Sequence, residues 1–150
     1  MKGMTIIVKT ISSWVKVLIV VFGIYIILFG HLTPGGGFAG GVILASSYLL
    51  IMLAFGREFV QKDLPLAIDS KLDCIGALLF AMIAVLGMVL CDKIFFDNFL
   101  YIPGKEFELI SAGTIPFSNI AIGLKVGTSL FLVIYLLSTF RRETSVKKEN

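Results

Sequence analysis

Charged residues are scarce in this sequence of 150 residues, because Asp, Glu, Lys and Arg together make up only 15% of it. A soluble domain carries about a quarter charged residues, so an ordinary soluble fold is not expected. Hydrophobic residues account for 57% of the chain, and the mean hydropathy is +0.98. This composition is typical of a protein with several membrane spans. The basic residues cluster at the ends of the apolar runs, a distribution that does not indicate nucleic-acid binding.

Histidine and cysteine are rarer still, with one histidine and two cysteines. Cys74 and Cys91 stand 17 positions apart on one apolar segment, and as a helix this separation spans about 25 Å, beyond the reach of a disulfide bond. No metal-ligand spacing occurs, and the histidine has no nucleophile beside it. We therefore expect no catalytic residue, no cofactor and no metal site in this chain.

The sequence contains four long apolar runs, and the length of each is close to the roughly 20 residues that a helix needs to cross a bilayer. The sequence predicts an all-α membrane protein with four transmembrane helices in a single membrane domain over residues 1–150. The expected spans are residues 14–30, 36–55, 74–91 and 117–140. An alternative interpretation makes the first run a secretory signal peptide, since lysines precede it, although it lacks a polar, flexible cleavage region.

The positions of the basic residues predict the orientation of the four spans. Nine of them fall on one side: Lys2, Lys9, Arg57, Lys62, Lys71, Arg141, Arg142, Lys147 and Lys148. Lys93 and Lys105 fall on the other. The excess of positive charge marks the cytoplasmic side, so both termini are expected there. We also expect residues 57–73 to form a cytoplasmic loop with room for one helical turn, and residues 141–150 a frayed cytoplasmic tail.

The outer loop, residues 92–116, is longer than a membrane hairpin requires and rich in aromatic residues. Loops of this length are usually functional or bound to a partner, and aromatic side chains suit the headgroup zone. The alternative is that the loop lies on its own helices.

A glycine-rich turn joins the first two spans. We expect Gly30 to end the first helix in a left-handed cap, with Thr33 as N-cap and Pro34 at the first helical position of the second. Each glycine inside a helix lowers its stability by about 1 kcal/mol relative to alanine. The glycines that follow Pro34 must therefore serve a purpose that offsets this loss. One reason is close helix packing through small residues four apart. The residues assigned to this hairpin packing are Pro34, Gly35, Gly36, Gly37, Phe38, Gly40 and Gly41.

The other reason is a functional site in which the exposed amides of the helix start lie beside His31. His31 either hydrogen-bonds a backbone carbonyl at the helix end or titrates near neutral pH and relays protons. Both interpretations stay open from the sequence.

Lys125 lies inside the fourth apolar run, where a lysine costs about 3 kcal/mol on insertion scales. It either extends toward the interface along its own stem or belongs to an ion pathway together with His31. A polar stripe on its helix favours the pathway, and the stripe consists of Ser118, Asn119, Thr128 and Ser129. Gly123 and Gly127 form a seam on the opposite side, suited to tight helix packing.

Two motifs together resemble a known family. Residues 30–41 read GHLTPGGGFAGG, and residues 113–126 read GTIPFSNIAIGLKV. The first resembles the GH-x-x-PGGGF-x-GG hairpin, and the second the G-x-x-P-x-x-N-x-x-x-GLKV segment, of the B subunit (MnhB) of Mrp-type multisubunit sodium/proton antiporters. In that family the motif positions are those of His31, Pro34, Gly35, Gly36, Gly37, Phe38, Asn119, Gly123 and Lys125.

The resemblance implies a small accessory subunit in the cell membrane of a prokaryote, with other antiporter subunits and membrane lipids as partners. Similar subunits occur in membrane-bound hydrogenase and sulfane reductase complexes, so redox subunits are further candidate partners. The main proton-channel residues of the family lie in larger subunits, and redox centres would lie on other chains. Two alternatives remain: a purely structural scaffold without an ion-handling residue, and a homo-oligomeric channel.

Overall fold

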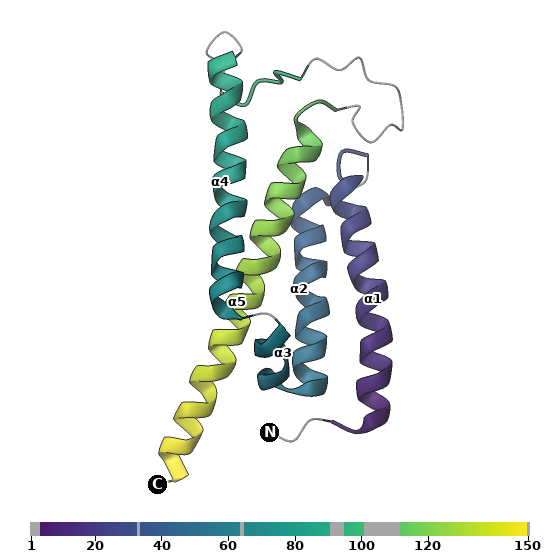
Figure 1. Cartoon of the computed structure of the whole chain (residues 1–150), viewed down its shortest axis with the longest axis vertical. Coiled ribbons are helices and arrows are strands. Elements are labelled where there is room, and N and C mark those ends of the chain that lie inside the picture. The colour runs from purple at the N-terminus through teal and green to yellow at the C-terminus, as the bar shows by residue number, and fades with distance from the viewer. Residues whose placement is uncertain (1–3, 33, 64, 91–94, 101–111, 150) are drawn as a thin grey trace.

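The computed structural model describes residues 4–32, 34–63, 65–90, 95–100 and 112–149, and all regular structure within these ranges is helical (Figure 1). The helices are α1 (Ile6–Leu28), α2 (Gly36–Phe55), α3 (Arg57–Asp63), α4 (Leu66–Leu90) and α5 (Ile115–Glu149). All but the short α3 contain a stretch that is long and apolar enough to cross a membrane. The prediction of an all-α chain with four such helices is confirmed.

Two segments contain more helix than we expected. The expected loop 57–73 holds α3 and the start of α4, which begins directly after Pro65, and the Pro65 carbonyl accepts the N–H of Ile68 at 2.8 Å. Proline favours this place because its fixed φ suits a helix start. The tail predicted to be frayed continues α5 as far as Glu149, since Arg, Lys and Glu are good helix formers. Helix ends are not membrane boundaries, so the expected spans remain predictions.

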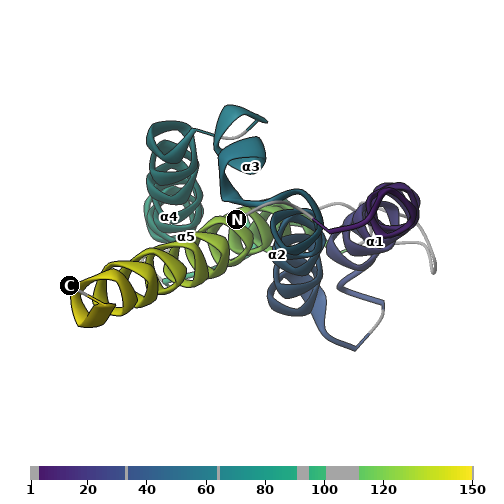
Figure 2. The ribbon, with the colours of Figure 1, turned by 90° about the horizontal axis from the view of Figure 1, so that it is seen from below.

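The helices form a bundle in which α5 is central (Figures 1 and 2). Helices α1 and α2 make an antiparallel hairpin, α5 packs against α2, and α4 packs against the other side of α5. A hydrophobic core near the lower end in Figure 1 joins α2, α3 and α5. Its buried residues are Ile51, Met52, Val60, Phe131 and Tyr135. The start of α1 and the end of α5 lie at this same end.

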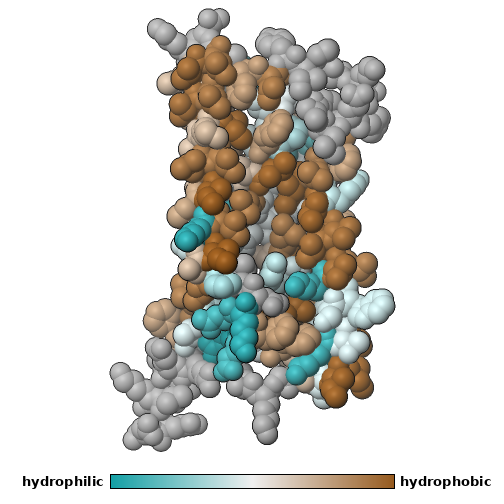
Figure 3. All heavy atoms as spheres, in the orientation of Figure 1, coloured by the Kyte–Doolittle hydropathy of each residue, from teal (hydrophilic) through white to brown (hydrophobic). Residues whose placement is uncertain are grey.

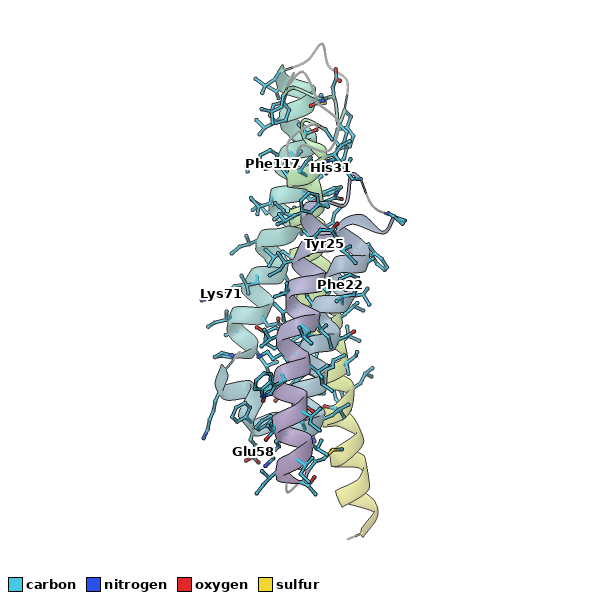
Figure 4. The ribbon with its side chains drawn as sticks, turned by 90° about the vertical axis from the view of Figure 1, so that its right-hand side faces the viewer. Phe22, Tyr25, His31, Glu58, Lys71 and Phe117 are labelled. Carbon is cyan, nitrogen blue, oxygen red and sulfur yellow. The ribbon has the colours of Figure 1, made fainter. Side chains whose placement is uncertain are left out.

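On the face shown in Figure 3, apolar side chains cover most of the surface, whereas hydrophilic side chains gather toward the lower end. Helix α1 shows this most plainly, because Trp14 is 76% exposed and Leu18 is 70% exposed. Phe22 and Tyr25 of the same helix are also exposed (Figure 4). Such a surface suits contact with lipid chains or with other membrane proteins.

The described part of the outer loop lies on α4. Phe96 packs on Phe80 with ring centroids 5.0 Å apart. Gly87 allows the backbone of Asp97 to approach, since a Cβ there would lie 2.8 Å from the Asp97 nitrogen. For residues 95–100 the loop therefore rests on its own bundle. Residues 101–111, together with Cys91 and Lys93, lie outside the described residues.

Candidate functional site

Lys125 of α5 and Asp73 of α4 form an ion pair between the two helices. The Lys125 Nζ lies 2.6 Å from one carboxylate oxygen of Asp73 and 2.7 Å from the other, so it contacts both. The Lys125 side chain is 40% exposed and the Asp73 side chain 21%. Among the side chains that the structure describes, which exclude Asp63 and those of residues 141–149, this is the one ion pair between acidic and basic groups. Its position within two membrane-length apolar helices makes it the leading candidate site.

The backbone of α4 comes close enough to α5 for this contact because of Gly76, one turn beyond Asp73. A Cβ at Gly76 would lie 2.8 Å from the backbone nitrogen of Lys125. Any larger residue would therefore push the two helices apart where the ion pair spans them.

The polar stripe on α5 is divided by the structure between two places. The Ser129 hydroxyl donates to Asp73 Oδ1 and so joins the ion pair. The buried Thr128 hydroxyl donates to the backbone carbonyls of Leu124 and Lys125 at 2.9 and 3.2 Å. Nearer the start of the helix, the Ser118 hydroxyl donates to the backbone carbonyl of Thr114, the residue just before α5, at 3.2 Å.

Asn119 turns instead toward the glycine-rich hairpin. Its side-chain oxygen accepts the backbone N–H of Gly37 at 3.3 Å, and its Nδ2 is buried with no hydrogen-bond partner among the described residues. A Cβ at Gly37 would collide with the backbone of Asn119. The hairpin glycines thus bring α2 and α5 into direct backbone contact.

The hairpin turn differs in detail from our expectation. Helix α1 ends at Leu28, and Gly30 does not have a positive φ. A Cβ at Gly30 would lie 2.6 Å from Cα of Gly36, so a glycine is required there for the close approach of the two backbone segments. The positive φ angles fall instead on Gly35, the N-cap of α2, with φ +117°, and on Gly36, its first residue, with φ +54°. Pro34 therefore precedes the helix rather than starting it. Thr33, the expected N-cap, lies outside the described residues.

The remaining glycines line two contacts. On the α1 side, Gly40 and Gly123 both meet Ile27. On the α2–α5 side, a Cβ at Gly41 would lie 2.8 Å from the Gly123 carbonyl oxygen, whereas one at Gly127 would make only ordinary contacts at 3.4 Å and beyond. Phe38 is 64% exposed and packs little within this chain.

His31 is half-buried in the hairpin turn, at the same end of the bundle as Phe117 (Figure 4). The adjoining Gly30 faces Asn119, and Lys125 follows Asn119 by six residues, or about 9 Å along α5. The structure therefore does not bring His31 and Lys125, the two predicted ion-pathway residues, together.

Two acidic residues were missed as site residues from the sequence. From the sequence, Asp73 was interpreted only as the last residue before an apolar run, and Asp69 was assigned to the loop 57–73. The structure makes Asp73 the partner of Lys125 and buries Asp69, one turn away, to 1% exposure. Their i, i+4 spacing ahead of an apolar run was the signal that could have placed both on one helix face.

The sequence matches the family model described as a domain related to the MnhB subunit of the Na+/H+ antiporter, over residues 7–132. An uncharacterized protein of Methanocaldococcus jannaschii is 40% identical, with 89% of this chain and 52% of that protein covered. The putative antiporter subunit mnhB2 of Staphylococcus haemolyticus is 29% identical, with 92% and 97% covered.

Among solved structures, a chain of the membrane-bound sulfane sulfur reductase, an archaeal respiratory membrane complex, superposes with a TM-score of 0.75. It is 27% identical, and the match covers 89% of this chain and 60% of that chain. The present chain thus spans about half the length of the Methanocaldococcus protein and 60% of the reductase chain. Since the family match extends over most of the residues, the chain belongs to the MnhB family of sodium/proton antiporter subunits.

Proposed function

We propose that this chain is a non-catalytic accessory subunit of a multisubunit sodium/proton antiporter module, where it helps shape the ion path and assemble the complex. The observation that carries the proposal is the Lys125–Asp73 pair with Ser129, set between two apolar helices. Charged side chains in such helices are costly, and they are rarely placed there except along ion or substrate pathways.

The proposed partners are other antiporter subunits in the cell membrane of a prokaryote. Few ionisable side chains lie within the described apolar helices, so neighbouring subunits would supply the rest of an ion path. The likeness to a chain of a respiratory sulfane sulfur reductase supports a redox-driven setting, with the redox centres on other chains.

The ion-path role is tested by Lys125→Ala in the assembled complex, compared with Lys71→Ala. Lys71 is exposed on α4 and points away from the bundle (Figure 4). Lys71→Ala therefore removes one positive charge, as Lys125→Ala does, but outside the candidate site. Sodium-dependent proton exchange is measured in inverted membrane vesicles, and assembly is followed on native gels. We expect Lys125→Ala to assemble and to lose exchange at least tenfold, whereas Lys71→Ala stays close to wild type.

A scaffold without an ion-handling residue is the second candidate, and the close backbone contacts of Gly37 and Gly41 favour it. On this alternative, full exchange would persist in Lys125→Ala, whereas variants that disturb the glycine contacts would lose assembly.

The composition of the complex is tested by purifying the tagged chain in a mild detergent and identifying its partners by mass spectrometry. Antiporter subunits together with iron–sulfur or nickel–iron proteins would establish the redox-driven setting. Antiporter subunits alone would indicate a stand-alone exchanger. Recovery of this chain without partners would contradict the subunit assignment.

A further inference from the structure

Asp69 is a buried carboxylate that the ion pair leaves unused. It lies in the first turn of α4 and is 1% exposed, and both of its oxygens are buried without a hydrogen-bond partner among the described residues. Asp73, one turn further, is by contrast contacted by Lys125 and Ser129. An ionised carboxylate without partners is strongly disfavoured in such surroundings.

The basic side chains that the structure describes are engaged elsewhere or exposed. Lys125 of α5 binds Asp73, and Arg57 of α3 donates to the Thr139 hydroxyl at 3.0 Å. Lys9 and Lys16 of α1 lie over the rings of Phe55 and Tyr48. Lys62 and Lys71 are exposed.

The other titratable groups around this end of α4 do not supply a partner either. On α5 the Tyr135 hydroxyl donates to the side chain of Gln61 on α3 at 3.2 Å. Glu58 of α3 is exposed, and Asp73 of α4 carries the same charge as Asp69.

The charge balance of this cluster is incomplete by one positive charge. Asp69 and Asp73 lie on one face of α4 at i, i+4 spacing, and Lys125 compensates only one of them. A metal cation requires several ligands at once, and no group of three or more His, Cys, Asp or Glu side chains occurs among the described residues. A proton requires only the carboxylate itself.

We propose that Asp69 binds and releases a proton, and that it adds a proton-binding site to this subunit one turn from the Lys125–Asp73 pair. The inference rests on the proposed function, in which protons are exchanged for sodium. On release, the O–H bond of the Asp69 carboxyl group breaks, its electron pair stays on the carboxylate, and the proton passes to water. The N-terminal end of α4 favours the negative form, so the carboxyl group can exist in both states.

Infrared difference spectroscopy on the purified complex tests the protonation directly. Spectra at acidic and alkaline pH are subtracted, and the C=O stretching region reports protonated carboxyl groups. We expect a band that disappears in Asp69→Asn, shifts in Asp69→Glu and is unchanged in Glu58→Gln. Glu58 is the matched control, because it is an exposed carboxylate on the neighbouring α3. Should the complex with Asp69→Asn fail to assemble, the shift of the C=O band in Asp69→Glu alone tests whether Asp69 is protonated.

Sodium-dependent proton exchange supplies the functional measurement on the same variants. We expect Asp69→Asn to lose exchange at least tenfold, Asp69→Glu to retain activity with an altered pH profile, and Glu58→Gln to match wild type. A wild-type spectrum without an Asp69-dependent band would overturn the inference, as would full exchange in Asp69→Asn. Absence of exchange in the wild-type complex would instead contradict the proposed function, while an Asp69-dependent band would still establish the proton-binding site.

Discussion

Lys125 and Asp73 come from positions 52 residues apart in the chain and meet where α4 packs against α5. Each compensates the charge of the other, and the Ser129 hydroxyl adds a third polar group to the same place. Removing either member leaves a charge in an apolar setting, and this cost exceeds what the pair contributes when intact.

A double-mutant cycle measures this coupling. We expect Lys125→Ala and Asp73→Asn to show an interaction free energy of about 1 to 3 kcal/mol, as for other contacting residues. Thermal unfolding of the purified complex, followed for this subunit, gives the stabilities. The cycle that combines Lys71→Ala with Asp73→Asn should give a value near zero, because Lys71 is exposed and directed outward. Equal coupling in both cycles would contradict a specific ion pair.

The sequence was informative about Lys125 and not about its partner. A lysine within an apolar run is conspicuous because it interrupts the run, whereas Asp73 stands at the edge of one and is indistinguishable there from an ordinary boundary residue. Asp69 was assigned to a loop, since the segment before it contains charges of both signs and a proline. Only the helical start at Leu66 places both carboxylates on the inward face.

Near the hairpin the helices α2 and α5 touch through backbone atoms, whereas toward their other end they pack through side chains of the hydrophobic core. Gly37 contacts the backbone of Asn119, and Gly41 contacts the carbonyl of Gly123. The hydrogen bond from the Gly37 N–H to the Asn119 side chain fixes the register of this contact. Small residues at such crossings permit the close approach on which helix association in a membrane depends.

Gly37→Ala and Gly127→Ala form a matched pair for testing this contact. We expect Gly37→Ala to lower the stability of the subunit by about 1 to 3 kcal/mol, because its methyl group must displace the backbone of α5. Gly127→Ala should be neutral or raise stability by up to about 1 kcal/mol, since its Cβ meets only ordinary contacts and alanine is the better helix former. Thermal unfolding of both variants gives the comparison, and equal losses would contradict the structural difference between the two sites.

Sequence reasoning anticipated that the glycines serve close packing but misplaced some of their roles. Small residues four apart predict a packing face without naming the partner helix. The partner of Gly37 is Asn119, 82 positions away, a contact that no local pattern encodes. The expected left-handed residue was Gly30, whereas the structure has the positive φ at Gly35. Gly30 is required by its close neighbours rather than by its own backbone angles.

At the scale of the whole molecule, the hydrophilic side chains on the face shown in Figure 3 lie mainly at the end that carries α3, the start of α1 and the end of α5 (Figures 1 and 3). This asymmetry agrees in direction with the charge distribution from which cytoplasmic termini are predicted. The orientation itself remains a prediction.

Single cysteines introduced after removal of Cys74 and Cys91 test the orientation. We expect Phe95→Cys, in the outer loop, to react with a membrane-impermeant maleimide in intact cells, because Phe95 is 61% exposed. Glu58→Cys on α3 should react only after the membrane is permeabilised. The reverse pattern of labelling would place the termini outside.

Helix α4 is attached to the rest of the bundle mainly through α5, as the view along the helices makes plain (Figure 2). Within the described part of the chain, any displacement of α4 relative to the bundle would therefore act mainly on its contacts with α5, which include Gly76 and the Lys125–Asp73 pair.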